Sequence, residues 1–164
     1  MKTILAIDPG ASGGLAVLHE SAIGTGPDQI HVWPMPATEG DLLSMVTVIN
    51  RYAVSANNER VAYLEEVGGF CGVGQPGSSM FKFGRGFGFI LGVLMATGWR
   101  VELVKPQKWQ KSFGLGTKAG AGGNTAWKNK LKAMAQRLYP AAKVTLKTAD
   151  ALLILDYAKQ QQAP

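Results

Sequence analysis

Three carboxylates in this sequence stand where a carboxylate can do chemistry. Asp8 directly follows the apolar run of residues 3–7. One acid of the pair Glu65-Glu66 follows a second apolar run, and Asp150 lies at the start of a third. Carboxylate oxygens are the ligands that Mg²⁺ and Mn²⁺ prefer, and three carboxylates gathered at one point would repel one another without a cation. Together they predict a divalent metal site suited to phosphodiester hydrolysis, in which the metal activates a water.

Each of these acids also has a plainer interpretation. Asp8 precedes Pro9-Gly10, a combination that is typical of a turn. The three acids could likewise be a turn residue, a strand end and a helix cap. Glu66 follows Glu65, and successive strand residues point to opposite faces of a sheet. Only one of these two glutamates can therefore join Asp8.

Strands and helices must position these acids, and the sequence predicts both. Apolar runs of β-branched and aliphatic residues bounded by Gly and Pro favour strands, whereas apolar residues at helical spacing favour helices. Asp8 would end the first strand and Glu65-Glu66 the fourth, and Thr38 or Asp41 would cap the first helix. The expected strands cover about residues 2–8, 14–19, 30–33, 60–67 and 99–104, and the expected helices 38–54, 78–97, 125–138 and 148–160.

These elements predict a single α/β domain over residues 1–164. Three antiparallel strands precede parallel strands that are joined by helices. A chain of 164 residues with 46% apolar residues can bury a core, which excludes a disordered protein. Cys71 is the one cysteine, so neither an internal disulfide nor a thiolate metal cluster can form. No run is expected to reach the length of a membrane span or a signal peptide, and we expect a soluble cytoplasmic protein.

The charge of the chain is unevenly distributed. Residues 1–81 carry a net charge of −5 and residues 82–164 a net charge of +11. A strongly basic half favours a polyanionic partner through counterion release, and nucleic acid is the commonest such partner. The alternative is a basic surface that only keeps the protein soluble. An anionic membrane is less favoured, because no long basic amphipathic helix is present.

The glycines of the second predicted helix form a pattern. Gly84, Gly88 and Gly92 recur every four residues and would lie on one stripe of that helix. Because glycine destabilises a helix, such a stripe suggests that a backbone approaches it closely. Another helix of the same chain or a partner subunit could supply that backbone.

Three short motifs together resemble a known family, the RuvC-type Holliday junction resolvases of the RNase H-like superfamily. They are Ile-Asp-Pro-Gly at 7–10, Leu-Glu-Glu-Val at 64–67 and Thr-Ala-Asp-Ala-Leu at 148–152. The segment 81–86 resembles the long interface helix of the family, and 114–116 followed by Lys128 resembles its glycine-lysine loop and helix. The segment 105–109 is most similar to phage and organellar relatives.

The resemblance implies an RNase H-like fold with a five-stranded mixed sheet flanked by helices. It implies a crossover junction endodeoxyribonuclease of DNA recombination and repair, which acts as a homodimer on four-way junctions with Mg²⁺, or Mn²⁺ in its place. Asp8, Glu65 and Asp150 would be the catalytic metal ligands. Lys147 stands where the family usually has Asp or His. It could contact the scissile phosphate, replace part of a cation's charge or be a surface lysine, since a protonated lysine cannot bind a metal.

The resemblance and the basic second half also suggest residues that contact DNA. Phe70 stands near the position of an aromatic residue that probes the junction centre in the family, although it could fold back on the core instead. Trp109 and Trp127 are expected to pack in the core rather than stack on bases. The predicted DNA-binding residues are Phe70, Lys82, Arg85, Lys108, Lys111, Lys118 and Lys128.

Two other functions compete with a nuclease. A catalytically inactive junction-binding or nucleic-acid-binding module would explain Lys147. An actin-like or sugar-kinase-like ATPase domain would explain the small residues after Asp8, which resemble a phosphate loop. That class needs two such domains with a cleft between them, and one domain argues against it and against a nucleotide cofactor.

Overall fold

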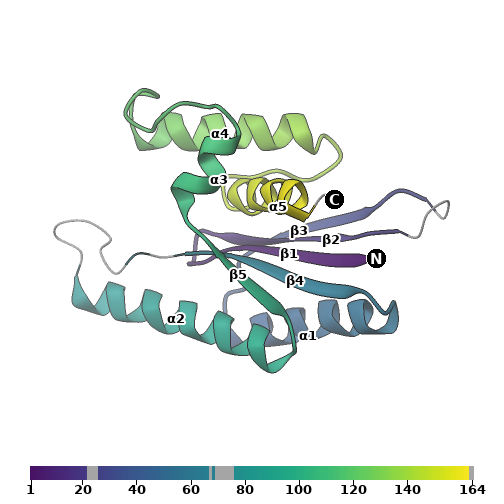
Figure 1. Ribbon diagram of the computed structural model, residues 1–164. Coiled ribbons are helices and arrows are strands. Elements are labelled where there is room, and N and C mark those ends of the chain that lie inside the picture. The colour runs from purple at the N-terminus through teal and green to yellow at the C-terminus, as the bar shows by residue number, and fades with distance from the viewer. Residues whose placement is uncertain (22–25, 67, 69–75, 163–164) are drawn as a thin grey trace.

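One mixed sheet with helices on both faces forms the fold (Figure 1). The structure is a computed structural model that describes residues 1–21, 26–66, 68 and 76–162. The strands lie in the order β3-β2-β1-β4-β5. They are β1 (Lys2–Asp8), β2 (Gly14–His19), β3 (Gln29–Pro34), β4 (Glu59–Glu65) and β5 (Arg100–Val104). The helices are α1 (Glu39–Ser55), α2 (Gly77–Ala96), α3 (Pro106–Ser112), α4 (Asn124–Leu138) and α5 (Ala149–Gln162).

The strand directions confirm the predicted mixed sheet. β1, β2 and β3 pair antiparallel, whereas β4 pairs parallel with both β1 and β5. Parallel neighbours need a crossover, and α1 and α2 supply the connections that return the chain to the start of the next strand. The ends of β1 and β4 therefore meet at one edge of the sheet.

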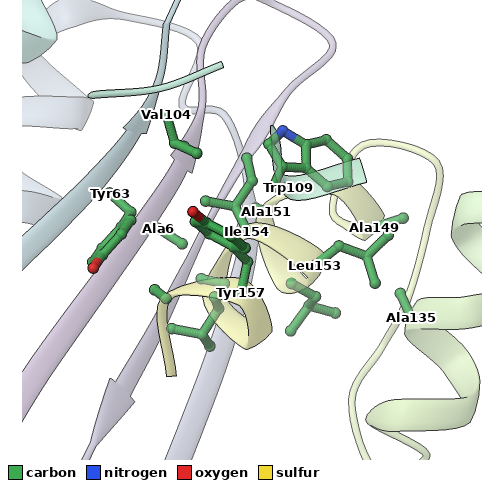
Figure 2. Packing of buried hydrophobic residues seen from close by; sticks show 14 of the residues in the cluster. Ala6, Tyr63, Val104, Trp109, Ala135, Ala149, Ala151, Leu153, Ile154 and Tyr157 are labelled. Atoms are coloured by element: carbon green, nitrogen blue, oxygen red, sulfur yellow. The ribbon is translucent and has the colours of Figure 1, made fainter. Parts of the chain in front are cut away.

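Two apolar clusters cover the two faces of the sheet. α1 and α2 pack on one face, while α5 packs on the other and lies between the sheet and α4 (Figure 1). α5 is therefore buried along most of its circumference, which explains its nearly continuous apolar sequence. Figure 2 shows part of this cluster, with Ile154 and Leu153 of α5 among residues from the sheet and α4.

The predicted elements agree with the structure to within one or two residues, with one omission. Thr38 caps α1, because its hydroxyl accepts a hydrogen bond of 3.1 Å from the backbone N–H of Asp41. The omission is α3, a seven-residue helix in a segment for which no helix was predicted. Its signal in the sequence was Pro106 directly after β5, since proline is favoured at the first position of a helix.

α2 presents much of its surface to solvent. Only Ile90, Val93 and Leu94 of this helix are buried, and Phe81 is 71% exposed. A Cβ atom added at Gly84, Gly88 or Gly92 would meet no atom within 4 Å, so core packing within the described chain does not explain these glycines. By length and composition alone α2 could cross a membrane, which differs from the expectation that no segment reaches that length.

Candidate functional site

The ends of β1 and β4 place two carboxylates side by side. Ile7 pairs with Leu64, so Asp8 and Glu65 follow at equivalent positions of neighbouring parallel strands. Residues two apart in a strand point to the same face, so Asp8 and Glu65 lie on the face of Ala6 and Tyr63, which α5 covers. Glu66 lies on the face of Leu64, which α1 and α2 cover. Glu65 is therefore the glutamate that joins Asp8, as its order in the predicted motif implied.

α5 brings the third carboxylate to this edge of the sheet. Asp150 lies in the first turn of α5 and is buried, with 4% of its surface exposed. The segment before α5 lies directly on the backbone of β2. A Cβ atom added at Gly14 would lie 2.6 Å from the carbonyl oxygen of Lys147 and 2.7 Å from that of Trp33. The absence of a side chain at Gly14 therefore lets the start of α5 approach the sheet.

The three carboxylates influence one another electrostatically. Burial, and then the negative charges of Glu65 and Asp150, raise the pKa of Asp8 from 3.8 to about 8. Burial also raises the pKa of Glu65, although hydrogen bonding from Trp109 opposes that shift. These shifts arise because burial and like charges both disfavour ionisation. The cluster therefore gathers more negative charge than the protein alone neutralises.

Lys128 of α4 is the cation that faces this cluster. Its ammonium group forms an ion pair with Oδ2 of Asp150. Burial alone would lower the pKa of Lys128, but the charge of Asp150 and the hydrogen bond to it, followed by the charges of Asp8 and Glu65, outweigh burial and raise it. The sequence predicted Lys128 as a DNA contact, and its ion pair with Asp150 was not foreseen.

Trp109 of α3 makes a second contact that was not foreseen. The prediction that Trp109 and Trp127 pack in the core is confirmed, because their exposed fractions are 0% and 4%. In addition, the indole Nε1 of Trp109 donates a hydrogen bond of 2.9 Å to Oε1 of Glu65. A packing residue thus also binds one of the clustered acids.

The donor set fits a divalent metal in its chemistry. All three acids offer oxygen ligands, and Oδ1 of Asp150 is buried without a hydrogen-bond partner in the described part of the chain. A buried carboxylate oxygen normally has such a partner. Within those residues, however, no group of three or more His, Cys, Asp or Glu side chains is arranged so that it could hold a metal ion. The three predicted ligands thus lie near one another without the arrangement of a metal site, and Oδ2 of Asp150 is paired with Lys128.

Lys147 lies beside this site and not in it. Its side chain is exposed, and it lines a hollow of about 590 Å³ together with Lys132 and Lys143. None of these three lysines forms an ion pair with an acid of the described chain. A contact between Lys147 and a phosphate stays a prediction.

The other predicted DNA contacts lie in two regions. Lys108 and Lys111 are exposed on α3, and Lys118 is exposed in the loop before α4. Lys82 and Arg85 lie on α2, where the guanidinium of Arg85 donates two hydrogen bonds of 3.0 and 2.9 Å to the carboxylate of Glu39. These roles stay predictions.

The aromatic probe and the homodimer are two further predictions. Phe70, the predicted aromatic probe, is not among the described residues. The expected homodimer stays a prediction. The open glycine stripe of α2 is the feature on which that expectation still depends.

Comparison of the structure with known structures finds a RuvC protein. A structure of Thermus thermophilus RuvC aligns over 98% of both chains, with 20% sequence identity and a TM-score of 0.55. A structure of T. thermophilus RuvC in complex with Holliday junction substrate aligns over 98% of this chain and 96% of the other, with 17% identity and a TM-score of 0.58. The chain has the RuvC fold. The predicted RNase H-like architecture is therefore confirmed.

The sequence comparisons give no match. No protein-family model and no curated protein sequence matches this chain. At 17 to 20% identity, the likeness to RuvC establishes the fold and not the activity.

Proposed function

We propose that this protein is a metal-dependent, structure-selective DNA endonuclease that resolves four-way junctions by paired phosphodiester cleavage. The observation that carries the proposal is the convergence of Asp8, Glu65 and Asp150 at one edge of a RuvC-fold sheet. The T. thermophilus RuvC of the same fold was solved with Holliday junction substrate. The basic second half of the chain suits the same class of partner, branched DNA.

Asp8, Glu65 and Asp150 would hold the divalent ion, Mg²⁺ or Mn²⁺. When bound, such an ion supplies an activated water and stabilises the leaving oxygen. Around it, the residues of this chain do separate tasks. Glu65 is held by Trp109, Lys128 balances the charge of Asp150 before the metal binds, and the lysines of α3 and of the hollow face solvent where a phosphate backbone could lie.

Paired cleavage of two opposed strands needs two such sites, so the proposal includes a homodimer. The exposed face of α2 is the candidate interface, because it offers Gly84, Gly88 and Gly92 with open space in front of them. Close approach of a second backbone is the use that a stripe of glycines on a helix suits.

A four-way junction with labelled arms, incubated with the protein and Mg²⁺, tests this proposal. Symmetric paired nicks are expected, and a chelator should abolish them. Binding of the junction without nicks, in either Mg²⁺ or Mn²⁺, would instead support the inactive junction-binding module. The ion pair between Lys128 and Asp150 is the observation that favours this second candidate, because it engages one proposed metal ligand. Nucleotide hydrolysis without DNA would favour the ATPase hypothesis.

A further inference from the structure

The indole of Trp109 is placed by the same strand pairing that places Glu65. Val104, the last residue of β5, pairs with Glu65, and the backbone N–H of Glu66 donates a hydrogen bond of 2.8 Å to the carbonyl of Val104. α3 begins two residues after Val104, at Pro106. The chain therefore turns back over the end of β4 after β5. Trp109, in the helix that follows β5, reaches Glu65 in this way.

Burial leaves the indole little freedom to move. Trp109 is fully buried in the cluster around α5 (Figure 2). Its ring meets that of Phe113 edge to face at a centroid distance of 6.5 Å. An indole N–H can only donate a hydrogen bond, and a carboxylate can only accept one. The contact of 2.9 Å thus fixes one oxygen of Glu65 against a rigid donor.

We infer that Trp109 is a positioning residue for the metal site: it holds Glu65 in the orientation in which Glu65 binds the ion. This inference rests on the proposed function. Hydrogen bonds to metal ligands orient those ligands, and losing one typically costs roughly 10- to 100-fold in metal affinity or activity. The same short helix also exposes Lys108 and Lys111. α3 therefore carries both predicted DNA contacts and the residue that holds a predicted metal ligand.

The chain contains a matched control for this test. Trp99 is buried to a similar extent, with 5% of its surface exposed, but it belongs to the cluster on the opposite face of the sheet. Its Nε1 has no hydrogen-bond partner in the described part of the chain. Trp99→Phe therefore removes a buried indole without removing a contact to the site, whereas Trp109→Phe removes both.

Both variants should be compared with the wild type by thermal unfolding and by calorimetric titration with Mn²⁺. We expect similar losses of stability, but Mn²⁺ affinity that falls roughly 10- to 100-fold in Trp109→Phe alone. The Mg²⁺ concentration for half-maximal junction cleavage should rise in parallel. Equal Mn²⁺ affinity in Trp109→Phe and the wild type would overturn the positioning role of Trp109 but not the proposed function. A wild type that neither binds Mn²⁺ nor cuts junctions would overturn the proposed function as well.

A measurement on the unmodified protein covers the case in which Trp109→Phe does not fold. The chain has four tryptophans, and their indole N–H groups give separate signals in a ¹⁵N–¹H spectrum. Addition of Mg²⁺ should shift the Trp109 signal and leave the Trp99 signal in place. A Trp109 signal that stays unchanged at saturating Mg²⁺ would contradict a link between this indole and the metal site.

Discussion

The two ends of the sheet both bury polar groups, but the groups at one end are charged and those at the other end are neutral. At the end described as the candidate site, three carboxylates share one lysine. At the other end, the hydroxyl of Thr3 lies 3.0 Å from Nδ1 of His19 and accepts a hydrogen bond of 3.0 Å from Asn58. Burial lowers the pKa of His19 to about 4, so this second group is neutral at physiological pH.

The difference separates a cluster that supports the fold from one that is suited to a ligand. Thr3, His19 and Asn58 are linked by hydrogen bonds and carry no charge, so this group needs no counter-ion, although Oδ1 of Asn58 is buried without a partner in the described residues. Clustered carboxylates do need a counter-ion, because each added negative charge raises the cost of ionising the others. The excess charge at the site end is what favours a divalent cation there.

The largest expected effect comes from removing a charge at the site end. Asp8→Asn should lower the rate of junction cleavage by about 10³-fold or more, because a divalent metal stabilises the transition state by several kcal/mol. Junction binding should persist in a mobility-shift assay, since the lysines are unchanged. His19→Gln, at the opposite end, should keep the cleavage activity. A near wild-type rate for Asp8→Asn would show that the metal-site assignment is wrong.

Loss of the positive charge of Lys128, which is paired with Asp150, should have the next largest effect. Without metal, Lys128→Met should destabilise the fold by about 2 kcal/mol, less than for a fully buried pair because the Lys128 side chain is 40% exposed. Saturating Mn²⁺ should restore more stability in this variant than in the wild type. Urea unfolding with and without Mn²⁺ measures both effects. Lys159→Met, in the last turn of α5, is the control and should show neither.

The two ends should also respond to pH in opposite directions, by about 1 kcal/mol or more each. The folded-state pKa of His19, about 4, lies below its ordinary value of 6.5, so its stabilising effect is present above pH 6.5 and is lost as pH falls toward 4. The pKa of Asp8, about 8, lies above 3.8, so stability is greatest below pH 4 and falls as pH rises toward 8.

Unfolding of the two variants in a chelator separates these contributions. Asp8→Asn should stabilise the protein more at pH 8 than at pH 5, because it removes the carboxyl that resists ionisation. His19→Gln should flatten the loss of stability between pH 6.5 and pH 4. Parallel pH profiles for the wild type and both variants would contradict the contrast between the two ends.

The smallest expected effect concerns two lysines near opposite ends of α5. Lys147 precedes this helix beside the site, and Lys159 lies in its last turn. If Lys147 contacts a phosphate, Lys147→Ala should weaken junction binding a few-fold and lower the slope of log affinity against log salt by about 1. Lys159→Ala should leave that slope unchanged. Equal slopes for both variants would make Lys147 a bystander.

The sequence predicted the strands and the helix that carry the three acids, because these elements depend on local patterns. A carboxylate after each of two apolar runs, with period-two alternation, predicted that one of Glu65 and Glu66 joins Asp8, and the family resemblance implied that it is Glu65. Asp150 followed from an acid at the start of an apolar helix. The strand directions followed from three strands before any helix.

The parts that could not be predicted depend on packing between segments far apart in the sequence. Lys128 meets Asp150 only because α4 lies across α5, and no local pattern fixes that crossing. Trp109 meets Glu65 because α3 turns back over the sheet, and a seven-residue helix is too short to show a clear periodicity. The position of Lys147 likewise depends on a contact between distant segments, because its backbone carbonyl lies close to Gly14 of β2.

Gly14 has no functional group, yet it governs how far apart the reactive groups stand. Even one methyl carbon at this position would have to displace the carbonyl of Lys147 or that of Trp33, and both belong to the backbone. The segment that would move leads straight into Asp150, whereas Asp8 is held by the strand pairing. A shift of about 1 Å between reacting groups can cost about 10²-fold in rate. In a scan of all positions, Gly14 should therefore tolerate replacement as poorly as the acids whose spacing it sets.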